Sequence, residues 1–234
     1  MQRSMQQSTQ QLADDSARTL ADRVFARLQD DIVRGVIAPG SKVSETDLAG
    51  RYGVSRGPLR EAIRRLESRK LVEREVHVGT RVASLSFTDL IEIYYVREAL
   101  EGQAARLAAE RMGDQEVAGL YQLLAQHEQQ QDLREDTAYF QREFDLDFHY
   151  RIIQGSHNQT LIRMLIGELY HLVRMYRYQF STTANRPQKA LHEHRRIVEA
   201  IESRDAEMAE LLMRRHIGRA RENIEQQAQQ RNPQ

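Results

Sequence analysis

Three histidines and one aspartate in the second half of the chain have the residue types and spacing of a divalent metal site. Asp145 and His149 are four residues apart, so a helix would carry both on one face. His194 and His216 each lie on the apolar side of a later amphipathic segment. Three imidazoles and one carboxylate from three helices would bind a first-row divalent cation, and the remaining positive charge would attract an anionic ligand. The alternative is a set of ordinary, partly buried polar residues, because no short motif links the four positions.

A second set of residues, in the first half of the chain, has the spacing of a nucleic-acid contact. Arg56, Arg60 and Arg64 recur every four residues and so share one helical face. The apolar residues between them have the spacing of a buried face: Leu59, Ala62, Ile63 and Leu66. Ser55 can cap this helix, and Pro58 is tolerated in its first turn. Such a helix suits the DNA major groove, whereas the alternative for the helix alone is a solvated surface.

The neighbouring segments predict the rest of a winged helix-turn-helix. Residues 44–54 have the pattern of a short helix that Ser44 caps and that Gly53 ends in a left-handed conformation. Residues 71–76 and 80–83 have the pattern of two short strands around a glycine-containing turn. A helix, a turn, a basic helix and a wing in this order are typical of a DNA-binding domain.

Composition and charge support this interpretation. Residues 17–84 carry 14 Lys and Arg against 9 Asp and Glu, whereas residues 85–234 carry 19 against 23. The basic part coincides with the helix-turn-helix, as expected for a DNA-binding module joined to a module with another role. The chain has no cysteine, which excludes disulfides and cysteine metal sites. It has no apolar leader and no run of 18 apolar residues, so we expect a cytoplasmic protein that neither enters nor crosses a membrane.

The pattern along the chain predicts a mainly α-helical protein with two domains. A winged helix-turn-helix is expected over residues 17–84 and an all-helical bundle of six or seven helices over residues 85–228. Disordered tails are expected at residues 1–16 and 229–234. The expected long helices are 17–34, 87–112, 114–129, 136–155, 159–180, 188–203 and 205–228.

Over residues 17–225 the chain resembles GntR-type transcription regulators, in the branch related to the fatty-acid regulator that carries an FCD effector domain. The resemblance to the DNA-binding half rests on these residues: Gly35, Pro39, Gly40, Ser44, Glu45, Leu48, Ala49, Gly53, Val54, Ser55, Arg56, Pro58, Leu59, Arg60, Glu61 and Ala62. The resemblance to the FCD half rests on another set: residues 97–101, Asp145, Phe148, His149, Asn158, residues 193–195 and His216. Gly57 departs from the family pattern, which usually has a small polar residue or alanine there.

The resemblance implies how the protein binds DNA. Arg56 and Arg60 would contact base edges or nearby phosphates, Ser55 a phosphate, and Gly79 the minor groove at the tip of the wing. Arg64 is a weaker candidate for a phosphate contact, and its alternative is an ion pair with Glu61 or Glu67. The family acts as homodimers on pseudo-palindromic operators in double-stranded DNA.

The resemblance also implies a metal-assisted effector pocket. Asp145, His149, His194 and His216 would hold a divalent cation, Zn²⁺ or Ni²⁺, and a small carboxylate metabolite would bind beside it. Arg97 is the candidate partner of that carboxylate, because its planar fork suits one; its alternative is a surface salt bridge with Glu101. Glu193 is expected to point elsewhere on its helix, away from the metal.

These features predict a metabolite-responsive transcription regulator, by default a repressor, rather than an enzyme. One alternative is a regulator for which the metal ion itself is the signal. The other is a metalloenzyme with a DNA-binding module, although no further acid, base or nucleophile stands out beside the four metal positions.

Overall fold

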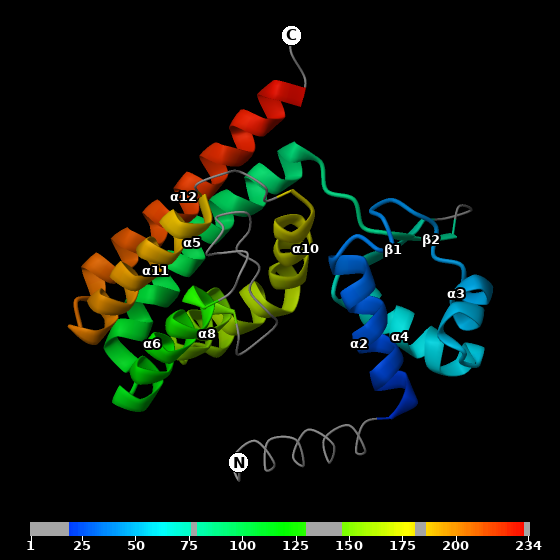
Figure 1. Cartoon of the computed structure of the whole chain (residues 1–234), viewed down its shortest axis with the longest axis horizontal. Helices are drawn as coiled ribbons and strands as arrows, with labels where there is room; N and C mark the ends of the chain where they lie inside the picture. Colours follow the sequence, from blue (N-terminus) through cyan, green and yellow to red (C-terminus); the bar gives the residue numbers. More distant parts are fainter. Residues whose placement is uncertain (1–18, 76–78, 130–146, 181–185, 232–234) are drawn as a thin grey trace. The chain divides into compact units, whose positions relative to one another are not determined.

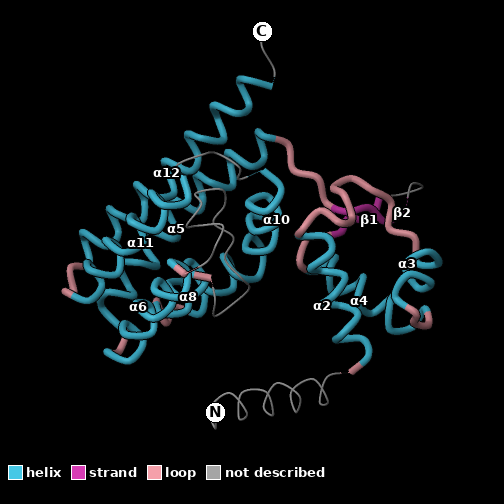
Figure 2. Tube along the Cα trace, viewed as in Figure 1, coloured by secondary structure: helices cyan, strands magenta, loops and turns pink. Residues whose placement is uncertain are grey.

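The computed structural model describes residues 19–75, 79–129, 147–180 and 186–231. The chain divides into two compact units between Ser84 and Leu85. The elements are mostly helices, with one small sheet in the first unit, and this confirms the predicted fold class (Figures 1 and 2). No helix in these described ranges is both long and apolar enough to cross a membrane.

The described residues of the first unit form three helices and a two-stranded wing. Its elements are α2 (Leu20–Val33), α3 (Glu45–Tyr52), α4 (Arg56–Ser68), β1 (Val72–Glu75) and β2 (Gly79–Val82). The strands are antiparallel, with Val72 opposite Val82. Helices α2 and α4 pack on each other, and their facing residues form a buried core that includes Leu28, Ile32, Leu59 and Leu66.

Local sequence signals set the ends of α3 but not the start of α4. The Ser44 hydroxyl accepts a hydrogen bond from the Asp47 amide, and Gly53 ends α3 with a φ of 65°. Ser55 occupies the position before α4, but its side chain makes no capping hydrogen bond, so this prediction is wrong. Pro58, the third residue of α4, has no N–H, so one of the two amides that a cap can use is absent.

The second unit is a bundle of helices. They are α5 (Phe87–Arg111), α6 (Asp114–Glu128), α8 (Phe148–Gly155), α9 (Gln159–Ile162), the π-helix η2 (Arg163–Leu169), α10 (Tyr170–Phe180), α11 (Arg186–Glu202) and α12 (Ala206–Arg231). The two longest, α5 and α12, lie side by side, and α11 packs against both (Figure 1). Their common core is apolar and includes Leu90, Ala108, Leu120, Phe148, Ile197, Met213 and Ile217.

Two of the expected helices differ from what the sequence predicts. Helix α8 starts only at Phe148, because the Asp147 carboxylate accepts from the amides of His149 and Tyr150 and so caps it. Asp145 therefore precedes α8, and it lies outside the described residues. The expected helix over 159–180 is α9, η2 and α10, because hydrophobic periodicity does not separate a π-turn from an α-turn.

The last helix is longer than expected. We expected a disordered tail from residue 229, but α12 continues to Arg231. The added residues are Gln229, Gln230 and Arg231, whose unbranched side chains lose little rotamer freedom in a helix.

Candidate metal centre and DNA-binding helix

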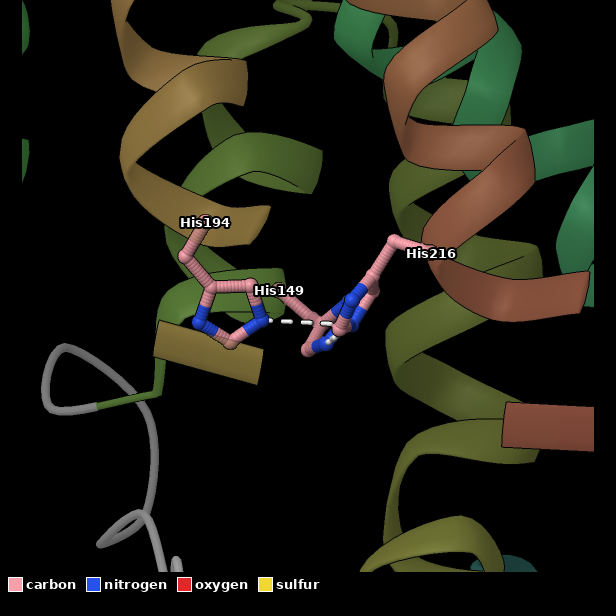
Figure 3. A group of neighbouring side chains, drawn as sticks. All are labelled: His149, His194 and His216. Atoms are coloured by element: carbon pink, nitrogen blue, oxygen red, sulfur yellow. Dashed lines mark hydrogen bonds between the residues drawn. The ribbon is translucent and has the colours of Figure 1, made fainter. Parts of the chain in front are cut away.

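Three histidines from three helices point at one another in the core of the second unit (Figure 3). His149 comes from α8, His194 from α11 and His216 from α12. The Nε2 atom of His216 lies 3.2 Å from Nε2 of His194 and 3.3 Å from Nε2 of His149. All three side chains are buried, so the structure brings together three of the four residues that the sequence predicts as metal ligands.

Two glutamates bind the other ring nitrogens of this cluster. His149 Nδ1 lies 2.6 Å from Glu101, and His216 Nδ1 lies 2.6 Å from Glu193. An ionised carboxylate only accepts hydrogen bonds, so each Nδ1 carries the proton. The Nε2 atoms of His149 and His216 are then left with lone pairs that face each other.

This arrangement fits a metal ion. Two imidazole lone pairs at 3.3 Å repel unless a cation or a proton lies between them. Nitrogens that bind one Zn²⁺ at about 2.0–2.1 Å in a tetrahedral arrangement lie about 3.3–3.4 Å apart. Carboxylates that hold the second ring nitrogen are the usual partners of metal-binding histidines.

The position of Glu193 corrects the sequence-based prediction. We expected this residue to point away from the metal, but one of its oxygens accepts from His216 and the other from Arg219. Glu193 and His194 do point in different directions from α11. The histidine that Glu193 supports, His216, lies on α12. Sequence spacing within one helix gives no signal for a partner on another helix.

Arg97 also lies in the core beside His149. Its Nε donates to Glu101 at 2.6 Å, so the ion pair weighed as an alternative is present, but it is buried rather than on the surface. Burial raises the pKa of the Glu101 carboxyl, but the Arg97 guanidinium and the hydrogen bonds from His149 and Arg97 outweigh this and hold the pKa well below its usual range. Glu101 is therefore ionised and links the arginine to the histidine cluster.

A small cavity lies beside Arg97 and His149. It has a volume of about 10 Å³, which is room for one water molecule. Its polar wall consists of Arg97, Glu101 and His149, and the remaining lining residues are Ile153, Leu165, Leu169, Tyr170 and Val173. The π-helix η2 and α10 supply most of the apolar wall, so enlargement of this cavity requires movement of those two elements.

In the first unit, the arginine stripe is exposed on α4. Arg60 Nε lies 2.7 Å from Glu45, and Arg56 reaches the Thr46 hydroxyl at 3.4 Å. Arg64 pairs with Glu61, which is one of the alternatives weighed for it. The sequence did not single out the partners on α3, because their contacts depend on how α3 and α4 pack.

The other two residues predicted to contact DNA lie outside α4. Ser55 immediately precedes α4, and its hydroxyl is not used as a cap. Gly79 begins β2 with a φ of 103°, a conformation that residues with a side chain rarely adopt.

Comparison with known proteins identifies the class to which this fold and these sites belong. Residues 20–82 match the bacterial regulatory proteins of the gntR family, and residues 92–219 match the FCD domain. The chain is 32% identical over 203 residues to the HTH-type transcriptional regulator YdhC of Bacillus subtilis (strain 168), a match that covers 86% of this chain and 88% of the relative. It is 32% identical over 205 residues to a probable D-xylose utilization operon transcriptional repressor of Paenarthrobacter nicotinovorans, covering 85% and 86%.

The match to the HTH-type transcriptional repressor RspR of Escherichia coli (strain K12) has 29% identity over 204 residues and covers 87% of this chain and 88% of the relative. Among solved structures, the fold is similar to that of E. coli McbR/YncC, with a TM-score of 0.70 at 22% identity over 90% of this chain and 99% of that one. The chain belongs to the gntR family of bacterial regulatory proteins and carries an FCD domain. It is a transcriptional regulator and not an enzyme.

Proposed function

We propose that this regulator is a homodimeric repressor that senses a small carboxylate metabolite through a metal ion in its FCD domain. The observation that carries the proposal is the convergence of three imidazoles, two of which, His149 and His216, have a carboxylate bound to Nδ1. The repressor names of two relatives support the sign of regulation. In this proposal residues 17–84 bind the operator, residues 85–228 bind the effector and form the dimer, and the protein works in the cytoplasm on the nucleoid.

The proposed ligands are Asp145, His149, His194 and His216, with Zn²⁺ or Ni²⁺ as the cation. Imidazole nitrogens suit both metals, and the donor set does not distinguish them. When bound, the metal supplies a Lewis acid that attracts a carboxylate oxygen. Glu101 and Glu193 keep two of the imidazoles in the tautomer that offers Nε2 to it.

Arg97 is the proposed effector contact. An entering carboxylate would share the guanidinium with Glu101, whose Oε1 atom now occupies its Nε edge. An organic acid is larger than the present cavity, so its binding favours a conformation in which η2 or α10 has moved. Preferential binding to that conformation would be the signal that changes operator affinity.

Operator binding is proposed to use α4 and the wing. Arg56 and Arg60 would reach base edges, Arg64 and Ser55 phosphates, and Gly79 the minor groove. In a dimer, two copies of α4 would read the half-sites of a pseudo-palindrome, because the symmetry of the protein matches that of the site.

A second candidate function is a regulator for which the metal ion alone is the signal. The specific observation in its favour is the volume of about 10 Å³ beside the histidine cluster, which does not accommodate an organic acid. Under this alternative, operator affinity responds to the metal with no organic ligand.

Thermal unfolding with and without metal tests these functions. A ligand that binds only the folded protein raises its stability by RT ln(1 + [L]/Kd). We expect one acid from a panel of hydroxy-, di- and tricarboxylates to stabilise the Zn²⁺-loaded protein but not the chelator-treated protein. That acid should also release the protein from operator DNA selected from genomic fragments. If metal alone changes operator affinity and no acid adds to it, the metal-sensing alternative is correct; if metal removal changes neither property, the metal-centre proposal is wrong.

A further inference from the structure

A second cavity lies along α11, on the other side of Glu193 from His216. It has a volume of about 670 Å³ and is lined by Gln188, Lys189, His192, Glu193, Arg196 and Arg219. Lys189, His192 and Arg196 are exposed and recur at the spacing of one helical face, while the residues between them that face the bundle are buried. We call this cavity the basic groove.

The charges of the basic groove are only partly neutralised. Within the described part of the chain, the side chains of Lys189, His192 and Arg196 make no ion pair or hydrogen bond. Arg219 pairs with Glu193 at 2.8 Å, and that carboxylate is also bound to His216. Among the residues that the structure describes, the groove therefore has an excess of positive charge, because no carboxylate pairs with Lys189 or Arg196.

We propose that the basic groove binds an organic phosphate, at a site separate from the cavity beside the histidines. A phosphate monoester carries about −1.5 to −2 charges at neutral pH, which balances the excess of two cations. Arginine forks and a lysine point charge are the side chains that recognise phosphate oxygens. The volume leaves space for the organic part of the ester, because small-molecule sites have about 300–1,000 Å³.

Glu193 connects this site to the metal centre. An anion that pairs with Arg219 weakens the hold of this arginine on Glu193, and the carboxylate then accepts more strongly from His216 Nδ1. A stronger acceptor at Nδ1 makes Nε2 a better metal donor. Phosphate binding in the groove therefore tightens metal binding; this coupling rests on the proposed metal centre, whereas the groove site itself does not.

The test is calorimetric titration of the full-length protein with glucose 6-phosphate, inorganic phosphate and sulfate at low ionic strength. We expect saturable binding of one glucose 6-phosphate per chain, tighter than that of the two inorganic anions. Arg196→Ala should weaken it at least about tenfold. The matched control is Arg195→Ala, which removes the same charge from the next residue, where the side chain pairs with Glu128 outside the groove.

Three results would overturn the proposal: binding that does not saturate, equal losses in the two arginine variants, or an inorganic anion that binds as tightly as the ester. Zinc affinity, measured by chelator competition with and without glucose 6-phosphate, checks the coupling. It should rise with the ester in the wild type and remain unchanged in Arg196→Ala. Titration of the metal-free protein with glucose 6-phosphate tests the groove alone. Binding there would support the groove even if the metal-centre proposal is wrong.

Discussion

In both units a candidate functional side chain is held by a carboxylate on another element. The two pairs differ in their exposure to solvent. In the first unit the side chains of Arg60 and Glu45 are 65% and 36% exposed. In the second unit those of His149 and Glu101 are 6% and 3% exposed. An exposed ion pair contributes about 0–1 kcal/mol and can exchange its partner for DNA, whereas a buried pair fixes one tautomer and one geometry. The difference supports a replaceable contact at the proposed DNA surface and a permanent one at the proposed metal centre.

The largest effect should follow from breaking the buried network. Glu101→Ala leaves Arg97 in the core without its ion-pair partner, and such an uncompensated charge costs about 3–5 kcal/mol. Denaturant unfolding of the metal-free protein measures this loss in the free energy of unfolding. Glu110→Ala on the exposed side of the same helix should change it by less than about 1 kcal/mol. An equal loss in the free energy of unfolding for the two substitutions would contradict the expected difference between buried and exposed ion pairs.

A smaller effect is expected when the metal centre keeps its ligands but loses a supporting carboxylate. Glu193→Gln removes the charged acceptor at His216 Nδ1, and loss of such a partner lowers metal affinity about 10- to 100-fold. Chelator competition with Zn²⁺ and Ni²⁺ measures the change. Glu199→Gln, an exposed substitution on the same helix, serves as the control. Unchanged metal affinity in Glu193→Gln would show that this hydrogen bond does not support a metal ligand.

At the DNA surface, the arginine should matter more than its carboxylate partner. Arg60→Ala should lower the affinity for a selected operator by about 1–3 kcal/mol, the value of a good arginine–base contact. Glu45→Gln should change it by less than about 1 kcal/mol, because the pair that it breaks is exposed. Electrophoretic mobility shifts at fixed salt compare the two variants. An operator affinity that falls more in Glu45→Gln than in Arg60→Ala would reverse this order.

The smallest effect concerns an exposed carboxylate in the first unit. Hydrogen bonds from Thr19 and Arg65 lower the pKa of Asp22 to about 2. A folded-state pKa below the unfolded value of about 3.9 contributes stability that is complete above that value and is lost as the pH falls toward 2. Asp22→Asn should therefore reduce the acid dependence of unfolding between about pH 4 and pH 2, as followed by circular dichroism. Thr19→Ala should reduce it as well; an unchanged pH profile in both variants would contradict the assignment.

The sequence predicts the parts of these sites that depend on one element at a time. Ser44 and Gly53 define α3 because capping is a local interaction. The inward positions of His194 and His216 follow from helical periodicity, since apolar residues on the same face must be buried. These signals need no knowledge of how the helices pack.

What the sequence does not predict depends on contacts between elements or on a competing local interaction. Glu101 and Glu193 support histidines on other helices, so their roles depend on the packing of α5 on α8 and of α11 on α12. Asp147 was overlooked because a cap can occur inside a segment whose apolar pattern continues through it. Asp145 remains a prediction, because it lies outside the described residues.

Pro58 affects both the stability of α4 and the groups that this helix can offer to DNA. A serine cap contributes about 1 kcal/mol to a helix, and α4 lacks this contribution; Pro58 removes one of the two amides that the Ser55 hydroxyl could cap. The Ser55 hydroxyl would therefore not have to break a bond with its own helix to make the proposed phosphate contact. Pro58→Ala would restore an amide hydrogen at the third position of α4. The Ser55 hydroxyl could then cap the helix, which would stabilise α4 but engage the hydroxyl.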